Sequence, residues 1–101
     1  MWKINEVDSL SNYRIFETEE FSKTLSKINH PYQKLITKKL QNQIYPQLKD
    51  EPHFGKNVKK LVGYNQETWR FRIGTYRLFY IIDESEKIVY LLHIELRKDA
   101  Y

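Results

Sequence analysis

The segment 68–80, TWRFRIGTYRLFY, limits the possible folds most, because it has the pattern of a β-hairpin. Hydrophobic residues alternate with other residues on both sides of 74–75, a two-residue link with glycine first, which is typical of a type II′ turn. The alternation predicts one face for the core and a second face that carries three arginines. The predicted pairs across the hairpin are Ile73 with Tyr76, Arg72 with Arg77, and Arg70 with Phe79.

Two arginines directly opposite each other repel, so Arg72 and Arg77 need solvent, an acid or an anionic ligand between them. A third strand over 88–96 extends the arginine face. Alternation predicts that its even-numbered residues point to the core. His93 and Arg97 then share the arginine face, and a five-residue turn places His93 opposite Arg77.

The segments before the hairpin predict a strand and two helices. Residues 13–18 read as a short strand, and 19–29 as an amphipathic helix with Thr18 as its N-cap. A second helix begins at Pro31, and Pro46 should kink or end it. The predicted fold is α+β: an N-terminal strand, a helical hairpin and a three-stranded antiparallel meander, with the helices on one sheet face. Residues 1–12 form an extension to a single domain over 13–101.

Composition excludes several functional classes. The chain has 101 residues and no cysteine, which excludes a disulfide-stapled domain, a thiolate metal site and a cysteine nucleophile. It has no apolar run long enough to span a membrane, and its first residues lack the apolar core of a signal peptide. We therefore expect a cytoplasmic protein with no membrane partner.

The charge is concentrated in one segment. The whole chain has 17 Lys and Arg against 13 Asp and Glu, but residues 53–80 contain six basic residues and only one acid, Glu67. A basic patch of this kind suits a polyanion or an acidic protein partner. The alternative is an ordinary solvated sheet face, with Glu67 and Glu95 pairing some of the arginines.

Three stretches resemble the RelE/ParE toxin superfamily of type II toxin–antitoxin systems. They are KKLVG (59–63), WRFRIGTYRLFYIID (69–83) and IVYLLHIELRKDAY (88–101), in the order and spacing of the family motifs. The resemblance covers roughly 13–101. It implies a fold like that of small microbial ribonucleases. RelE-like members cut messenger RNA in the ribosomal A site through attack of the ribose 2′-hydroxyl, with no metal and no cofactor.

The resemblance also implies site residues. Arg77 would clamp the scissile phosphate, and Arg97 would stabilise or protonate the leaving group. Tyr101 would stack on a base or orient the 2′-hydroxyl, and Arg70 falls where RelE-like members place a catalytic lysine. The RNA-binding residues would be Arg72, His93, Lys59 and Lys60.

Two positions depart from the family pattern. Thr68 stands where some members have a second lysine, and Leu96 stands where many have a histidine, so His93 would have to substitute. The alternatives are therefore a ParE-like inhibitor of DNA gyrase and an inactive relative that only binds an antitoxin. The implied partners are a cognate antitoxin, the ribosome and its messenger RNA. DNA would be contacted only through the antitoxin.

Overall fold

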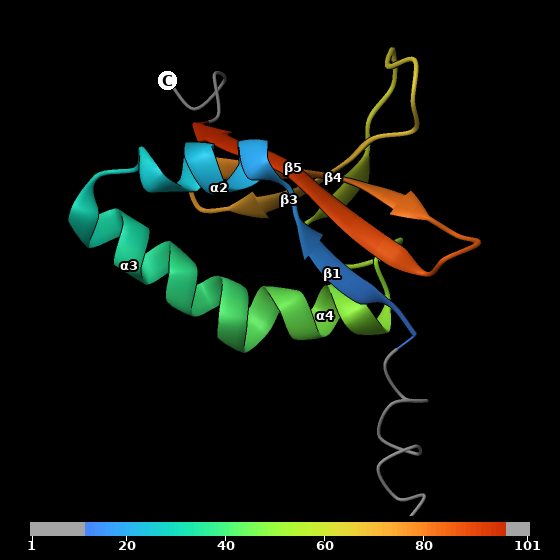
Figure 1. The fold of residues 1–101 in the computed structure, drawn as a ribbon, viewed down its shortest axis with the longest axis horizontal. Coiled ribbons are helices and arrows are strands. Elements are labelled where there is room, and N and C mark those ends of the chain that lie inside the picture. The colour runs from blue at the N-terminus through green and yellow to red at the C-terminus, as the bar shows by residue number, and fades with distance from the viewer. Residues whose placement is uncertain (1–11, 97–101) are drawn as a thin grey trace, which may run out of the picture.

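A five-stranded sheet with helices against one face makes up the described part of the chain, residues 12–96 of the computed structural model (Figure 1). The sheet order is β1-β5-β4-β3-β2, with β1 parallel to β5 and every other pair antiparallel. The elements are β1 (Arg14–Glu17), α2 (Glu19–Ser26), α3 (His30–Lys39), a π-helical turn (Leu40–Ile44), α4 (Tyr45–Asp50), β2 (Val58–Lys60), β3 (Trp69–Ile73), β4 (Tyr76–Asp83) and β5 (Ile88–Leu96). The α+β prediction is confirmed.

The predicted hairpin is β3–β4, and its register is as expected: Ile73 pairs with Tyr76 and Arg72 with Arg77. Gly74 has a φ of 60°, which the two-residue turn requires and which glycine adopts without strain. Sequence reasoning missed β2, which pairs antiparallel with β3 at the edge of the sheet. Three residues, two of them lysines, give too little alternation to be recognised as a strand.

The prediction for the third strand is wrong in its first half. Val89 and Leu91 are fully buried in the core, whereas Tyr90 belongs to the other face. A register shift leaves Leu92 without a partner in β4, which is a β-bulge, and the parity changes there. Ile94 beyond the bulge is buried as expected. The shift places Phe79, rather than Arg77, opposite His93.

Thr18 fixes α2 to this bulge. Its Oγ1 accepts a hydrogen bond from the backbone N–H of Phe21 at 3.2 Å, the predicted N-cap. The same hydroxyl donates to the carbonyl oxygen of Leu91 at 2.6 Å. Six residues later, Oγ1 of Thr24 accepts from the N–H of Ile94 at 3.0 Å. Helix α2 is therefore tied to β5 on both sides of the bulge.

Pro46 does not end the second helix, contrary to one of the outcomes predicted for it. The backbone stays helical to Asp50 (Figure 1). Over Leu40–Ile44 the hydrogen bonds change to the wider π pattern. The N–H of Tyr45 bonds to the carbonyl of Leu40, five residues earlier. The wider π-helical turn directly before Pro46 accommodates the proline ring and its missing N–H donor, so the helix continues.

The core lies between the helices and the sheet. Its fully or nearly fully buried side chains come from every layer, with Phe21 from α2, Leu48 from α4 and Tyr80 from β4. Tyr80 also donates a hydrogen bond from its hydroxyl to the carbonyl oxygen of Pro52 at 2.7 Å, 28 residues away. Burial raises the pKa of the Tyr80 hydroxyl, so it stays a donor.

We predict that Tyr80→Phe lowers the free energy of unfolding by about 1–2 kcal/mol, because the Pro52 carbonyl keeps its burial and loses its donor. Urea unfolding measures this change. Tyr32→Phe is the control, since Tyr32 is 58% exposed on α3 and should unfold like the wild type. Equal stability of both variants would contradict the role of this hydrogen bond.

Candidate functional site

Basic side chains lie in two rows on the sheet face opposite the helices. One row crosses β3, β4 and β5 as Arg72, Arg77 and Glu95. The other crosses four strands as Lys59, Arg70, Phe79 and His93. We call Lys59, Arg70, Arg72, Arg77 and His93 the basic face. The structure thus brings together five of the predicted site residues.

Asn57, just before β2, holds the two arginines of β3 in place. Nη1 of Arg70 donates to the carbonyl oxygen of Asn57 at 3.0 Å, and the backbone N–H of Arg72 donates to the same oxygen at 2.9 Å. Arg70 is half-buried as a result, whereas the side chain of Arg72 is exposed. No signal in the sequence indicated Asn57.

His93 is positioned by a ring contact. Its imidazole stacks on Phe79 with ring centroids 4.6 Å apart and planes 19° apart. Phe79 is only 4% exposed although it faces away from the helices. His93 Nε2 lies 3.5 Å from Oε2 of Glu95, the residue directly opposite Arg77 in the sheet register. The face therefore combines cations, one imidazole and one carboxylate, a set that can bind a phosphate and move a proton.

Other predicted site residues lie elsewhere. Lys60 pairs in register with Trp69, so it points away from the basic face, and its Nζ bonds to Oε2 of Glu67 at 2.6 Å. Thr68 is buried, and its hydroxyl donates to the carbonyl of Gln66 at 2.8 Å. Leu96 ends β5 and is 58% exposed. The predicted residues Arg97 and Tyr101 lie outside the described residues.

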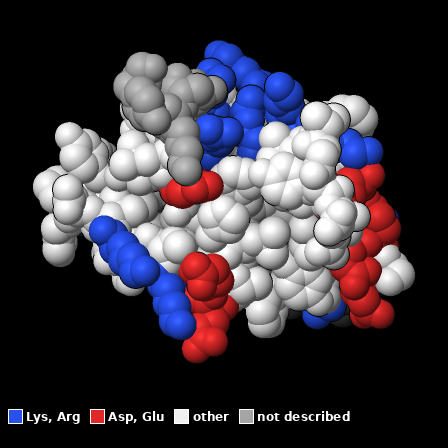
Figure 2. All heavy atoms as spheres, turned by 90° about the horizontal axis from the view of Figure 1, so that it is seen from above, with Lys and Arg blue, Asp and Glu red and all other residues white. Residues whose placement is uncertain are grey.

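The charged groups are separated over the surface. Figure 2 shows the largest group of Lys and Arg side chains in this view apart from the largest group of Asp and Glu. Separation of this kind gives one region a positive potential that attracts a polyanion and orients it on approach.

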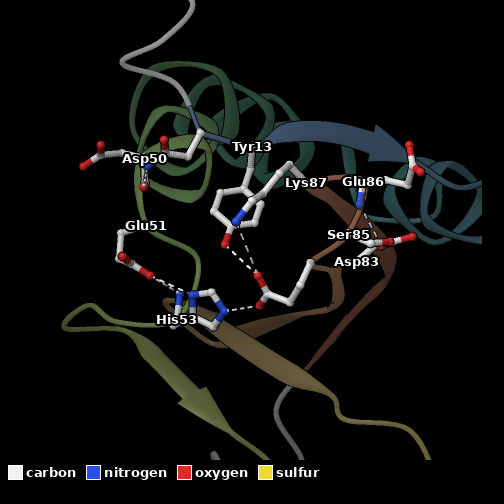
Figure 3. A network of polar contacts seen from close by, with 10 residues as sticks. Tyr13, Asp50, Glu51, His53, Asp83, Ser85, Glu86 and Lys87 are labelled. Atoms are coloured by element: carbon white, nitrogen blue, oxygen red, sulfur yellow. Dashed lines mark hydrogen bonds and ion pairs between the residues drawn. The ribbon is translucent and has the colours of Figure 1, made fainter.

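A second cluster of titratable groups contains His53, which contacts both Glu51 and Glu84. Figure 3 shows His53 beside Glu51, with Tyr13 and Lys87 close by. His53 Nδ1 is 2.8 Å from Oε2 of Glu51, and Nε2 contacts Oε2 of Glu84. The hydroxyl of Tyr13 donates to Oε1 of Glu84 at 2.9 Å, and Lys87 Nζ lies 5.0 Å from the centre of the Tyr13 ring. The cluster joins the residue before β1, the α4–β2 connection and the β4–β5 turn.

The pKa shifts of this cluster follow from its contacts. Partial burial lowers the pKa of His53, but the hydrogen bonds and charges of Glu84 and Glu51 outweigh it, so the pKa is raised. The hydrogen bond to His53 lowers the pKa of Glu51 and of Glu84. Burial, and then the bond to Glu84, raises the pKa of Tyr13 to about 12. The charged imidazolium and carboxylates are thus the favoured forms.

A groove of about 340 Å³ lies between α3 and the β3–β4 turn. Its lining is mostly apolar and includes Tyr32 and Leu35, which are 58% and 63% exposed, with Lys39 at its edge. Exposed apolar side chains gathered around a groove are typical of a protein-binding surface.

Among residues 12–96, no three or more His, Cys, Asp or Glu side chains are grouped to hold a metal ion. None of the helices described is both long and apolar enough to cross a membrane.

Residues 12–101 match a family model described as ParE toxin of type II toxin–antitoxin system, parDE. The match spans nearly the whole chain, including the basic face. No curated protein sequence matches the chain significantly.

Solved structures of toxins are similar to the chain. The toxin–antitoxin complex RelBE2 from Mycobacterium tuberculosis is 26% identical, with a TM-score of 0.69 over 89% of this chain and 97% of that chain. The archaeal RelE–RelB complex from Pyrococcus horikoshii is 23% identical, with a TM-score of 0.65 over 88% and 99%. The isolated E. coli RelE toxin is 19% identical, with a TM-score of 0.62 over 87% of each chain. The last two similarities concern the fold alone.

We predict that the His53 cluster makes stability depend on pH. The raised pKa of His53 contributes stability that is complete below its ordinary value of 6.5 and is lost as the pH rises through the raised value. The lowered pKa values of Glu51 and Glu84 contribute stability that is present above 4.5 and is lost as the pH falls. The contribution of the cluster is therefore largest between these limits.

Urea unfolding at about pH 5.5 and about pH 8.5 tests this window. We expect the wild type to lose stability at the higher pH, and His53→Gln to lose less, because the amide does not titrate. An equal loss in both proteins would assign the pH effect to other groups.

Proposed function

The chain belongs to the ParE toxin family of type II toxin–antitoxin systems, and from this premise we propose that it is a ribosome-dependent endoribonuclease that cuts messenger RNA. The observation that supports this activity most is the placing of three arginines and Lys59 on one open sheet face, with Arg72 directly opposite Arg77. Two neighbouring guanidinium groups suit a doubly bridged phosphate.

The proposed chemistry is transesterification within the RNA. The ribose 2′-oxygen forms a bond to the adjacent phosphorus, the bond to the 5′-oxygen breaks, and a proton passes from the 2′-hydroxyl to the leaving oxygen. The transition state carries extra negative charge on the phosphorane oxygens. Guanidinium groups that are already in place stabilise that charge without reorganisation.

Each residue of the basic face has a proposed role. Arg77 binds the scissile phosphate, and Arg70, held by Asn57, supports the developing charge. Arg72 and Lys59 hold neighbouring phosphates. His93, stacked on Phe79 and next to Glu95, is the group that can move a proton in a chain with Leu96 at the usual histidine position. Arg97 and Tyr101 keep the roles that the family resemblance implies.

The second candidate is inhibition of DNA gyrase through protein contacts alone. The match to the ParE family favours it, and a shared fold does not separate the two activities. The two proposals differ in what they require of Arg77: a nuclease needs its charge at the phosphate, whereas a gyrase inhibitor needs only the surface that contacts its target.

We predict that expression of the wild-type chain in growing cells cuts a translated message inside codons, and that Arg77→Ala abolishes the cuts. The expected loss is on the order of a hundredfold or more, because one preorganised charge is removed from the transition state. Mapping 5′ ends measures the cuts. A copy of the message without its start codon shows whether translation is needed.

Lys38→Ala is the matched control, since it removes an exposed positive charge from α3, away from the basic face. It should cut like the wild type. Growth arrest with double-strand DNA breaks and no cut message would overturn the nuclease proposal in favour of gyrase. Growth without arrest would leave an antitoxin-binding relative that lacks the activity.

We also propose that the chain binds a cognate antitoxin, as the 26%-identical RelBE2 toxin is found in a complex with one. The apolar groove beside α3 offers contact area outside the basic face. An antitoxin that covers both surfaces would need apolar residues for the groove and acidic residues for the arginines.

We predict that Leu35→Glu weakens the complex by about tenfold or more, because it places a charge in the apolar groove. Titration with the antitoxin from the same operon measures the affinity. Val62→Glu is the control, since Val62 is 90% exposed in the loop between β2 and β3. If both variants bind like the wild type, the groove is not part of the interface.

A further inference from the structure

A third row of side chains continues the open sheet face beyond the basic face. It crosses β4, β5 and β1 as Ile81, Tyr90 and Phe16. Their sequence neighbours Val89 and Leu91 are fully buried on the helix side, which places this row on the same face as the arginines. The face is therefore basic over β2–β3–β4 and aromatic over β5 and β1.

The aromatic end is open to a ligand. The rings of Phe16 and Tyr90 are 5.4 Å apart with planes at 57°, and Phe16 is 53% exposed on an edge strand. A large apolar side chain on an exposed edge costs solubility and invites unwanted strand pairing, so sheet stability alone explains it poorly.

A cation lies beside the rings. Arg14 is two residues from Phe16 on the same face of β1 and is exposed. A groove along β1 is lined by Arg14 and Phe16 together with Lys49 of α4. Glu17 lines the same groove, and its carboxylate accepts a hydrogen bond from the hydroxyl of Tyr45 in α4. Asp83 is paired in register with Ile88, and its carboxylate is bonded to Ser85 and the N–H of Glu86 in its own turn. Arg14 is therefore the cation that shares the open face with the two rings.

The basic end and the aromatic end of the face are close enough for one extended nucleic-acid strand to contact both. Ile81 and Arg77 are four residues apart on β4, about 13 Å at the rise of a β-strand. Between them lies the stack of Phe79 and His93. Aromatic rings next to cations are the arrangement that binds single-stranded nucleic acid, with bases on the rings and phosphates on the cations.

We propose that Phe16 and Tyr90 form a base-stacking subsite for single-stranded RNA, which holds a nucleotide that flanks the phosphate bound on the basic face. This inference rests on the proposed nuclease function and adds residues of β1 and β5 to it. A short RNA strand is the occupant that both halves of the face fit, because an apolar peptide would leave the arginines unmatched and a free phosphate would leave the rings unused.

The test measures binding of a short fluorescent RNA to the full-length chain by anisotropy. The probe carries 2′-O-methyl riboses so that it cannot be cut. Phe16→Leu keeps the apolar volume and removes the aromatic face. We expect it to bind about five- to tenfold more weakly, and Phe16→Tyr to bind like the wild type. Phe54→Leu is the matched control, since Phe54 is 73% exposed in the connection before β2.

A second arm replaces one base of the probe at a time by an abasic residue. At the position that stacks on Phe16, the abasic probe should weaken binding to the wild type but not to Phe16→Leu, because the two changes remove the same contact. Additive losses at every position would overturn the subsite. So would equal binding by Phe16→Leu and the wild type.

Arg72→Ala separates failure of the subsite from failure of the proposed function. If Arg72→Ala weakens RNA binding while Phe16→Leu does not, the basic face binds RNA and the aromatic subsite is wrong. If the wild type does not bind the probe at all, the aromatic subsite is overturned, whereas the nuclease proposal stands or falls separately with the cuts in translated messages. Tyr90→Leu is a check against a folding defect in the edge strand β1, since it removes the second ring from the interior strand β5 and should give a similar loss of binding.

Discussion

The hydroxyl group of Thr18 joins the start of α2 to the bulge in β5, and the arrangement of both sheet faces depends on this junction. Because of the bulge, β5 pairs with β4 in one register before Leu92 and in another after it. On one side of Leu92, Val89 and Leu91 fill the core, and on the other side Ile94 does, although the two parities differ. Without the extra residue, either the core would lose these side chains or His93 and Glu95 would turn away from the arginines.

The hairpin could be predicted from the sequence because its signals agree with one another. Glycine at 74 fixes the turn, arginines mark one face, and large apolar residues mark the other. The sequence signals for strand β5 did not agree with one another in this way. Residues 88–92 are all apolar, so alternation carries no information until His93, and projecting the pattern backward from Ile94 chose the wrong face. The bulge is also tied to Thr18 by a tertiary hydrogen bond, which local sequence does not encode.

The candidate site likewise has features that the sequence predicted and features that it did not. The opposition of Arg72 and Arg77 follows from turn length alone and was predicted. The anchoring of Arg70 to Asn57, the stack of His93 on Phe79, and the opposite facing of Lys59 and Lys60 all depend on strand pairs with β2 or with the far side of the bulge. Contacts between segments far apart in the chain were therefore the part that sequence reasoning missed. The continuation of the helix past Pro46 belongs to this class too, since Leu40, Ile44 and Leu48 all need the same core.

The direct opposition of Arg72 and Arg77 has a thermodynamic consequence for the whole molecule. An anion that bridges the two guanidinium groups binds the folded chain and not the unfolded one, so its binding free energy adds to the stability of the fold. RNA and an acidic antitoxin segment would each act in this way, so each would raise the melting temperature as well as fill the face. The melting temperature of the fold would therefore report whether a ligand occupies the surface that we propose carries the activity.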